Sequence, residues 1–177
     1  MGLGRYLIGH LVKKVIAEVI AEVIDDELRN INTLNEVTPK KGSILICPLG
    51  GKRPYNEWHS GIYIGYSEIV ELKGDGNIRK VTPEQFKNDG ILRNGNQIYV
   101  ACNKNGSILS DVIIAQRAKQ KLGSKRNYNV LLDNCHQFSA GCITGDFERD
   151  DNFKKFLEWT ISEELNMGDG VNWCPWK

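Results

Sequence analysis

The sequence predicts an α+β fold in which helices pack on a sheet, with an additional helix at the N-terminus. The first observation is a series of short apolar runs between residues 44 and 102, which are rich in β-branched residues and separated by turn residues. The second is a set of segments with helical apolar spacing after residue 110. We expect an N-terminal helix and connector at 1–38, a main domain at 39–165 and a Trp-containing tail at 166–177.

The composition is that of an ordinary globular domain. The chain has 177 residues, with 23 basic and 22 acidic residues and a net charge of +1. Because nucleic-acid binding needs a clustered basic surface, we expect no nucleic-acid partner. The five cysteines are scattered and odd in number, so they indicate no disulfide framework, and their spacing fits no zinc motif. We expect a reducing compartment and no cofactor or metal.

Segment 3–28 is the clearest predicted helix. Apolar pairs recur every four residues, with charged residues between them. Because no apolar run approaches the roughly 20 residues of a membrane span, we expect neither a signal peptide nor a span, and a cytoplasmic protein. Three interpretations of the helix remain open: packing on its own domain, pairing with another subunit, or peripheral contact with a membrane surface.

The rest of the chain follows in order. A polar connector occupies 29–40. Strands are predicted at 44–47, 57–65, 69–72, 78–81 and 97–102. Helices are predicted from Thr82 to about Asp89, from Ser110 to Lys121, from about Cys135 onward, and at 152–164. The tail has no periodicity, and its two Trp residues either clamp on the domain or form an exposed end.

Cys135 is a candidate nucleophile because of its place in the chain. It follows an apolar run and begins a predicted helix, for which Asp133 or Asn134 supplies the N-cap. The positive end of the helix dipole favours a thiolate there, and the thiolate is the reactive form. A buried structural cysteine is the alternative interpretation, and it is the commoner fate of a free cysteine.

His59 is the best base for Cys135 by elimination. The chain has three His residues; His10 lies in the first helix, and His136 adjoins Cys135 and therefore points elsewhere. Strand alternation puts His59 and Tyr63 on one face, together with two glycines that leave room beside the imidazole.

Glu71 is the candidate for the third polar group, which would orient the imidazole. A two-residue turn at Tyr66–Ser67 would put Glu71 on the face opposite His59, whereas a three-residue turn through Glu68 would put both on one face. The sequence leaves this register open, and a solvent-facing Glu71 is the simpler alternative.

Two blocks of the chain together resemble the LRAT-like family. The blocks are His59-Ser60-Gly61-Ile62-Tyr63-Ile64-Gly65 with Ile69-Val70-Glu71-Leu72, and Tyr128-Asn129-Val130-Leu131-Leu132-Asp133-Asn134-Cys135-His136-Gln137-Phe138. The family comprises lecithin:retinol acyltransferase and related phospholipases and acyltransferases, a circularly permuted branch of the NlpC-type, papain-like cysteine enzymes. The resemblance covers roughly residues 39–145.

The resemblance implies that a helix carrying Cys135 packs on an antiparallel sheet carrying His59 and Glu71. It implies Cys135 as nucleophile, His59 as base and Glu71 as the third polar residue. Relatives usually have His at the third position, so Glu71 is a departure. The family's Asn-Cys-Glu-His-Phe also differs here, where the chain has Asn134-Cys135-His136-Gln137-Phe138.

The first functional hypothesis is therefore a cysteine hydrolase or acyltransferase that works through a thioester, on a lipid acyl ester or, less favoured, a peptide amide. The backbone N–H of Cys135 is expected to stabilise an oxyanion. Further oxyanion or substrate-lining candidates are Asn134, His136, Tyr63 and Trp58.

Two other hypotheses stay open. One is a non-catalytic module that binds a partner through the N-terminal helix and the Trp tail. The other is a zinc site of Cys135, His59 and Glu71, since a thiolate, an imidazole and a carboxylate are all zinc ligands.

Overall fold

The computed structural model describes residues 36–49, 58–89, 93, 95–126, 135–148 and 153–177. The predicted helix at 3–28 and both candidate N-cap residues of the Cys135 helix, Asp133 and Asn134, lie outside this set. The chain divides into two compact units, Met1–Leu34 and Asn35–Lys177, and all that follows concerns the second unit.

One antiparallel sheet of six strands forms the centre of the unit Asn35–Lys177, in the order β4-β3-β2-β1-β5-β6. The strands are β1 (Ile44–Pro48), β2 (Trp58–Gly65), β3 (Glu68–Leu72), β4 (Ile78–Val81), β5 (Tyr99–Cys102) and β6 (Asn172–Pro175). The helices are α2 (Pro83–Lys87), α3 (Val112–Gln120), α4 (Cys135–Thr144) and α5 (Lys154–Asn166). The predicted α+β fold with an antiparallel sheet is confirmed.

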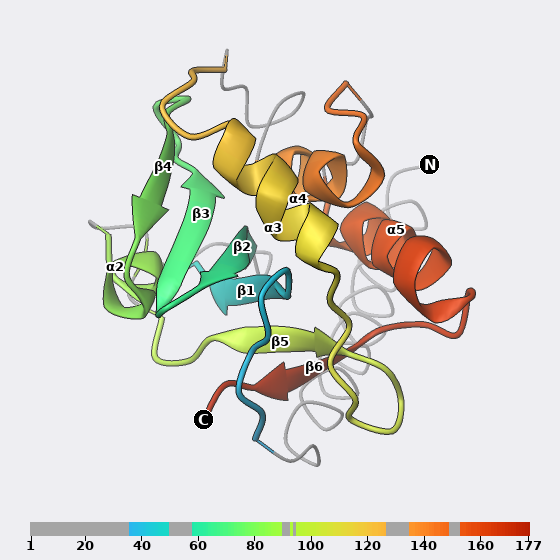
Figure 1. The fold of residues 1–177 in the computed structure, drawn as a ribbon. Helices are drawn as coiled ribbons and strands as arrows, with labels where there is room; N and C mark the ends of the chain where they lie inside the picture. The colour runs from blue at the N-terminus through green and yellow to red at the C-terminus, as the bar shows by residue number, and fades with distance from the viewer. Residues whose placement is uncertain (1–35, 50–57, 90–92, 94, 127–134, 149–152) are drawn as a thin grey trace, which may run out of the picture. The chain divides into compact units, whose positions relative to one another are not determined.

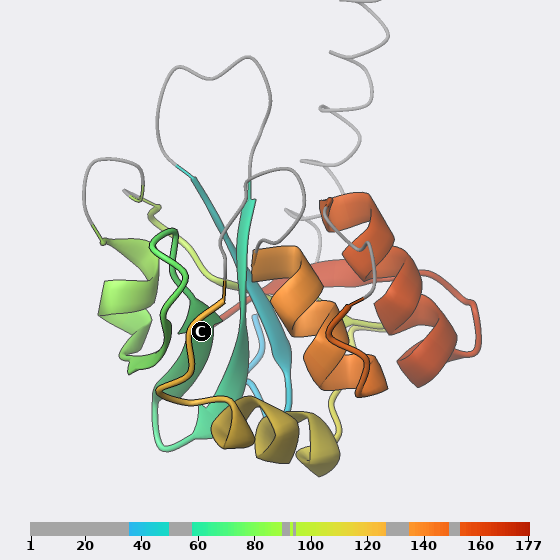
Figure 2. The same ribbon diagram turned by 90° about the horizontal axis from the view of Figure 1, so that it is seen from above.

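Helices cover both faces of the sheet. Helix α2 lies on one side, while α3, α4 and α5 lie on the other (Figures 1 and 2). Thr82 begins α2 with the predicted capping box, in which its hydroxyl accepts the Gln85 N–H and the Gln85 side chain accepts the Thr82 N–H. Asp111 caps α3 through the Ile113 N–H.

Apolar residues fill both faces of the central strands, which explains why β1 is a continuous apolar run. On the α2 side the core contains Leu45, Cys47, Ile69, Val81, Phe86, Ile98 and Val100. The alternate strand residues Ile44, Ile46, Ile62, Val70 and Leu72 are also buried, and by strand alternation they face α3, α4 and α5.

The C-terminal tail is an edge strand of the sheet. Strand β6 pairs with β5, and the ring of Trp176 packs against Tyr63 at 5.4 Å between centroids. Trp173 is buried, and its indole N–H donates to Glu158 Oε1 at 2.7 Å. Of the two interpretations of the tail, the structure therefore shows the Trp residues packed on the domain.

A bulge in the β2–β3 hairpin decides which face carries Glu71. A two-residue turn, Tyr66–Ser67, joins the strands, and both residues have positive φ, as a type I′ turn requires. The register then shifts between Tyr63 and Gly65, where Gly65 has φ 95°. Gly61 therefore lies opposite Glu71, whereas an unshifted register would place Ile62 there. The sequence left this register open. The structure combines the two-residue turn with an extra residue at the bulge, which puts Glu71 and His59 on one face.

Candidate active site

Cys135 is the first residue of α4 and is buried. Ser60 fixes the start of this helix to β2, since its hydroxyl donates to the Cys135 carbonyl at 2.8 Å and lies 2.9 Å from the Ser139 hydroxyl. The sulfur forms hydrogen bonds with the His59 side chain and with Ser60. The predicted helix start therefore holds the thiol beside the imidazole.

His59 lies between Cys135 and Glu71. Its Nε2 is 2.8 Å from Glu71 Oε2, and because a carboxylate only accepts, Nε2 carries the proton. This leaves Nδ1 for the hydrogen bond with Cys135. The ring also packs on Phe86, with 5.1 Å between centroids, in the space beside Gly61. The imidazole is thus fixed on three sides.

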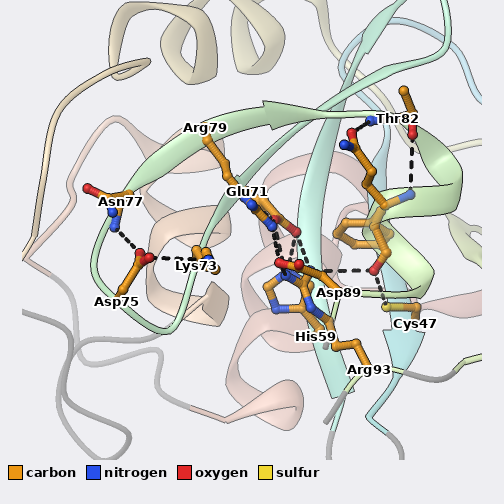
Figure 3. A network of polar contacts seen from close by, with 12 residues as sticks. Cys47, His59, Glu71, Lys73, Asp75, Asn77, Arg79, Thr82, Asp89 and Arg93 are labelled. Carbon is orange, nitrogen blue, oxygen red and sulfur yellow. Dashed lines mark hydrogen bonds and ion pairs between the residues drawn. The ribbon is translucent and has the colours of Figure 1, made fainter. Parts of the chain in front are cut away.

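Glu71 is fully buried and bound by two guanidinium groups (Figure 3). Arg93 contacts both carboxylate oxygens, with Nη1–Oε2 at 2.5 Å and Nη2–Oε1 at 3.2 Å. Arg79 donates from Nε to Oε1 at 2.8 Å. Asp89 Oδ2 accepts from Arg93 Nη2 at 2.7 Å and also from Arg79 Nη2. The interpretation of Glu71 as a solvent-facing residue does not fit this burial.

The three groups shift one another's pKa values. Burial opposes ionisation of the Cys135 thiol, but the His59 charge and hydrogen bonds from His59 and Ser60 hold its pKa below the ordinary value. Burial also opposes protonation of His59, but Cys135 and Glu71 raise its pKa to about 9. The Glu71 pKa falls to about 2, because His59 and Arg93 outweigh burial. A thiolate–imidazolium pair with an ionised Glu71 is the state that these shifts favour at neutral pH.

The other four cysteines differ from Cys135. All are buried and none is in a disulfide. Burial raises the pKa of Cys47 to about 12 and also raises the pKa values of Cys102 and Cys142. Cys47, Cys102 and Cys142 therefore stay protonated, and the arrangement favours Cys135 over these three as the nucleophile.

Three of the residues predicted to line the oxyanion or substrate site, His136, Trp58 and Tyr63, lie among the described residues. His136 is buried next to Cys135, and its Nδ1 lies 3.1 Å from the Ser60 hydroxyl. Trp58 precedes His59 on β2, and its ring packs on Tyr99 and lies 5.5 Å from Lys154 Nζ. Tyr63 lies towards the other end of β2, where its hydroxyl accepts the Ser67 N–H and its ring packs on Trp176. Tyr63 therefore contacts the hairpin turn and Trp176, the residue after β6.

Sequence reasoning missed four residues of the site: Ser60, Arg79, Asp89 and Arg93. Ser60 is adjacent to His59, and strand alternation should have directed it towards the helix layer. Arg79 lies directly opposite Glu71 on β4, so the pairing of β3 with β4 would have identified it. Asp89 and Arg93 lie outside the strands, and nothing in their local sequence indicates a contact with Glu71.

The zinc alternative does not fit the contacts of Glu71. Both of its oxygens accept hydrogen bonds from arginine, and a cationic guanidinium at each oxygen opposes a bound metal ion. Within the described ranges, no group of three or more metal-ligating side chains is present. Within the same ranges, no helix has both the length and the apolar character needed to cross a bilayer.

Comparison with protein families identifies a match over the main domain. The family model described as lecithin retinol acyltransferase matches residues 38–148, which is more than half of the chain. No curated protein and no solved structure matches the chain.

Proposed function

Since the chain belongs to the lecithin retinol acyltransferase family, we propose that it is a thiol hydrolase or acyltransferase in which Cys135, His59 and Glu71 act together. The observation that carries this proposal is the position of His59, hydrogen-bonded to Cys135 on one side and to Glu71 on the other. Acyltransferase or hydrolase chemistry is what the family suggests; the roles of the three residues are our proposal.

In the first half of the reaction, the Cys135 thiolate attacks the carbonyl carbon of an ester. The C–S bond forms as the carbonyl electron pair moves to oxygen, giving a tetrahedral oxyanion. The backbone N–H of Cys135, at the first position of α4 where a helix leaves its N–H groups without intrahelical acceptors, is the donor that we propose for this charge. As the ester C–O bond breaks, imidazolium His59 donates its proton to the leaving alkoxide, and a thioester remains.

In the second half, water or an acceptor alcohol or amine attacks the thioester. Neutral His59 removes the proton of the attacking group, and the C–S bond breaks to release the thiolate. The product is a free acid or a transferred acyl group, and the thiolate–imidazolium pair is restored. Glu71 holds the imidazole in one orientation and tautomer in both halves.

A lipid acyl ester is the substrate class that we favour over a peptide amide. The support is an aromatic surface on α5, which consists of Phe153, Phe156 and Trp159, all exposed. The helix itself approaches the site at its start, where Lys154 Nζ lies 5.5 Å from the ring of Trp58, the residue before His59. Exposed Phe and Trp residues are typical of surfaces that enter a lipid–water interface.

A non-catalytic module on the same fold is the second candidate function. It predicts a Cys135 that behaves like the other buried cysteines. The hydrogen-bonded Cys135–His59 pair argues against it, because a purely structural cysteine needs no such partner.

The test is the pH dependence of iodoacetamide alkylation of each cysteine, measured by peptide mass spectrometry in the native chain and in His59→Ala. We expect Cys135 alone to react well below pH 8.5, and to lose this reactivity in His59→Ala. The four other cysteines serve as internal controls. A Cys135 that is inert, or that titrates as before in His59→Ala, would refute the proposal. Screening of acyl esters in vesicles against peptides then separates the substrate classes.

A further inference from the structure

The polar contacts of Glu71 continue beyond the three residues of the proposed mechanism. Glu71 and Asp89 are bridged by Arg93 and Arg79, and each arginine contacts both carboxylates. The side chains of Glu71 and Arg93 are nearly inaccessible, at 0% and 8% exposure, whereas Asp89 and Arg79 are about one-third exposed. We call these four residues the carboxylate–guanidinium cluster (Figure 3).

The formal charges of the cluster cancel. Two carboxylates contribute −2 and two guanidinium groups contribute +2, so the net charge is zero. A lone buried carboxylate against Nε2 would add a full negative charge beside the Cys135–His59 pair. The cluster instead presents an oriented hydrogen-bond acceptor without net charge.

Arg93 occupies the decisive place in the cluster. Its Nη1 binds Oε2, the same oxygen that accepts the His59 proton, and its Nη2 binds Oε1. A two-pronged contact fixes the plane of a carboxylate, which a single bond does not do. Arg79 contacts only Oε1 and is more exposed, so its charge is better screened.

We propose that Arg93 is a positioning residue for the Cys135–His59 pair, acting through Glu71, and that Asp89 and Arg79 complete the charge balance around it. The inference rests on the proposed function, because it concerns the same thiolate–imidazolium pair. It extends that function by naming the residues that fix Glu71 in place of the family's usual His.

Other titratable groups near the cluster are accounted for. On β1, Cys47 donates to the Phe86 carbonyl at 3.3 Å, and its pKa of about 12 keeps it neutral. On α4, His136 has a pKa of about 3 and is also neutral. The nearby cations Lys87 on α2 and Lys154 on α5 are paired with Glu84 and Glu158. Neither Cys47 nor His136 therefore adds a charge beside the cluster at neutral pH.

The charge balance predicts shifts of opposite sign. Arg93→Met leaves the cluster with one net negative charge. This charge stabilises the protonated forms of Cys135 and His59, so we expect both pKa values to rise by about one unit. Asp89→Asn leaves one net positive charge, so both pKa values fall, by less because Asp89 is farther away and more exposed. Arg93→Lys keeps the charge but loses the two-pronged contact, so we expect both pKa values to return only part of the way to their native positions.

The experiment is the alkylation profile of Cys135 from pH 4 to pH 10 in the full-length chain. The lower transition reports formation of the thiolate, and the upper transition reports loss of the His59 proton. Lys80→Met is the matched control, because it removes one positive charge from the neighbouring position on β4, where Lys80 pairs with Glu68 at the surface. We expect both of its transitions to stay within about 0.2 units.

The outcomes separate the inference from the proposed function. Opposite shifts in Arg93→Met and Asp89→Asn, with partial recovery in Arg93→Lys, support the inference. Full recovery in Arg93→Lys would overturn the positioning role of Arg93, because charge alone would then be sufficient. Transitions that do not move, or that shift in the same direction in both variants, overturn the inference. The proposed function is then still supported if the native chain has a low-pH Cys135 transition. Absence of that transition in the native chain overturns both. If Arg93→Met fails to show a cooperative thermal melt, Asp89→Asn and Arg79→Met decide the sign.

Discussion

His136 is a buried histidine that stays neutral. Burial lowers its pKa to about 3, and the positive charges of His59 and Lys154 add to this effect. A protonated His136 would compete with the imidazolium of His59 for the same negative surroundings. Its neutral ring instead contacts the Ser60 hydroxyl, which holds the first turn of α4 against β2.

His136 should make the folded state sensitive to mild acid. Its pKa is lower in the folded chain than the ordinary 6.5, so its contribution to stability is present above pH 6.5 and is lost as pH falls towards 3. Over this range the unfolded chain binds a proton at His136 that the folded chain does not bind. The free energy of unfolding therefore falls by up to about 1.4 kcal/mol for each unit by which the pH is lowered. We predict that His136→Gln shows a flatter decline between pH 6.5 and pH 4 in urea unfolding. An unchanged slope would contradict the prediction.

At the scale of elements, the absence of a side chain at Gly61 lets α2 approach the hairpin. A Cβ at Gly61 would lie 2.8 Å from a Phe86 ring carbon and 3.0 Å from the Val70 carbonyl oxygen. Phe86 is fully buried and packs on His59, so it has no free space into which to move.

Gly61→Ala should therefore cost stability and disturb the site together. We predict a loss of about 1–3 kcal/mol in the free energy of unfolding, as for other overpacked cores, and slower alkylation of Cys135 at pH 7. Gly74→Ala is the matched control, because a Cβ there meets nothing within 4 Å. Equal free energies of unfolding in the two variants would contradict the prediction, because the Phe86 ring would then shift away from the new Cβ without loss of stability.

The aromatic surface of α5 gives a second prediction for an element. If Phe153, Phe156 and Trp159 contact lipid, Trp159→Ser should lower the rate with an acyl lipid in vesicles several-fold and leave the rate with a water-soluble acyl ester unchanged. Val112→Ser, an exposed apolar residue on α3, is the control. Equal losses with both ester forms would mean that Trp159 supports folding rather than lipid contact.

The hairpin shows how far the sequence predicts the site. Residue type and order were sufficient to propose Cys135, His59 and Glu71 as a set, and the structure brings these three side chains together. Whether Glu71 and His59 share a face depended on a one-residue bulge. Gly65 permits this bulge, but a glycine at that position is not sufficient to predict it. The same limit applies to β6, because its strand conformation comes from pairing with β5 and not from its own periodicity.

At the scale of the whole molecule, the site residues Cys135, His59 and Glu71 all belong to the unit Asn35–Lys177. Cys135 contacts Ser60 on β2, and His59 packs on Phe86 of α2. Glu71 binds Arg79 on β4 and Arg93, which lies between α2 and β5. The amphipathic segment 3–28 belongs to the other compact unit, Met1–Leu34. We propose that this segment provides peripheral membrane contact or self-association, rather than part of the reactive pair.

Removal of residues 1–34 tests this division. We predict that the shortened chain keeps a cooperative thermal melt and the same Cys135 alkylation profile, because the described core and site lie within Asn35–Lys177. Co-sedimentation with anionic vesicles, or the mass in solution measured by light scattering, should fall relative to the full chain, according to which of the two roles the segment has. A shortened chain that loses the low-pH reactivity of Cys135 would instead place the segment in the site, since the thiolate–imidazolium pair would then depend on contacts from Met1–Leu34.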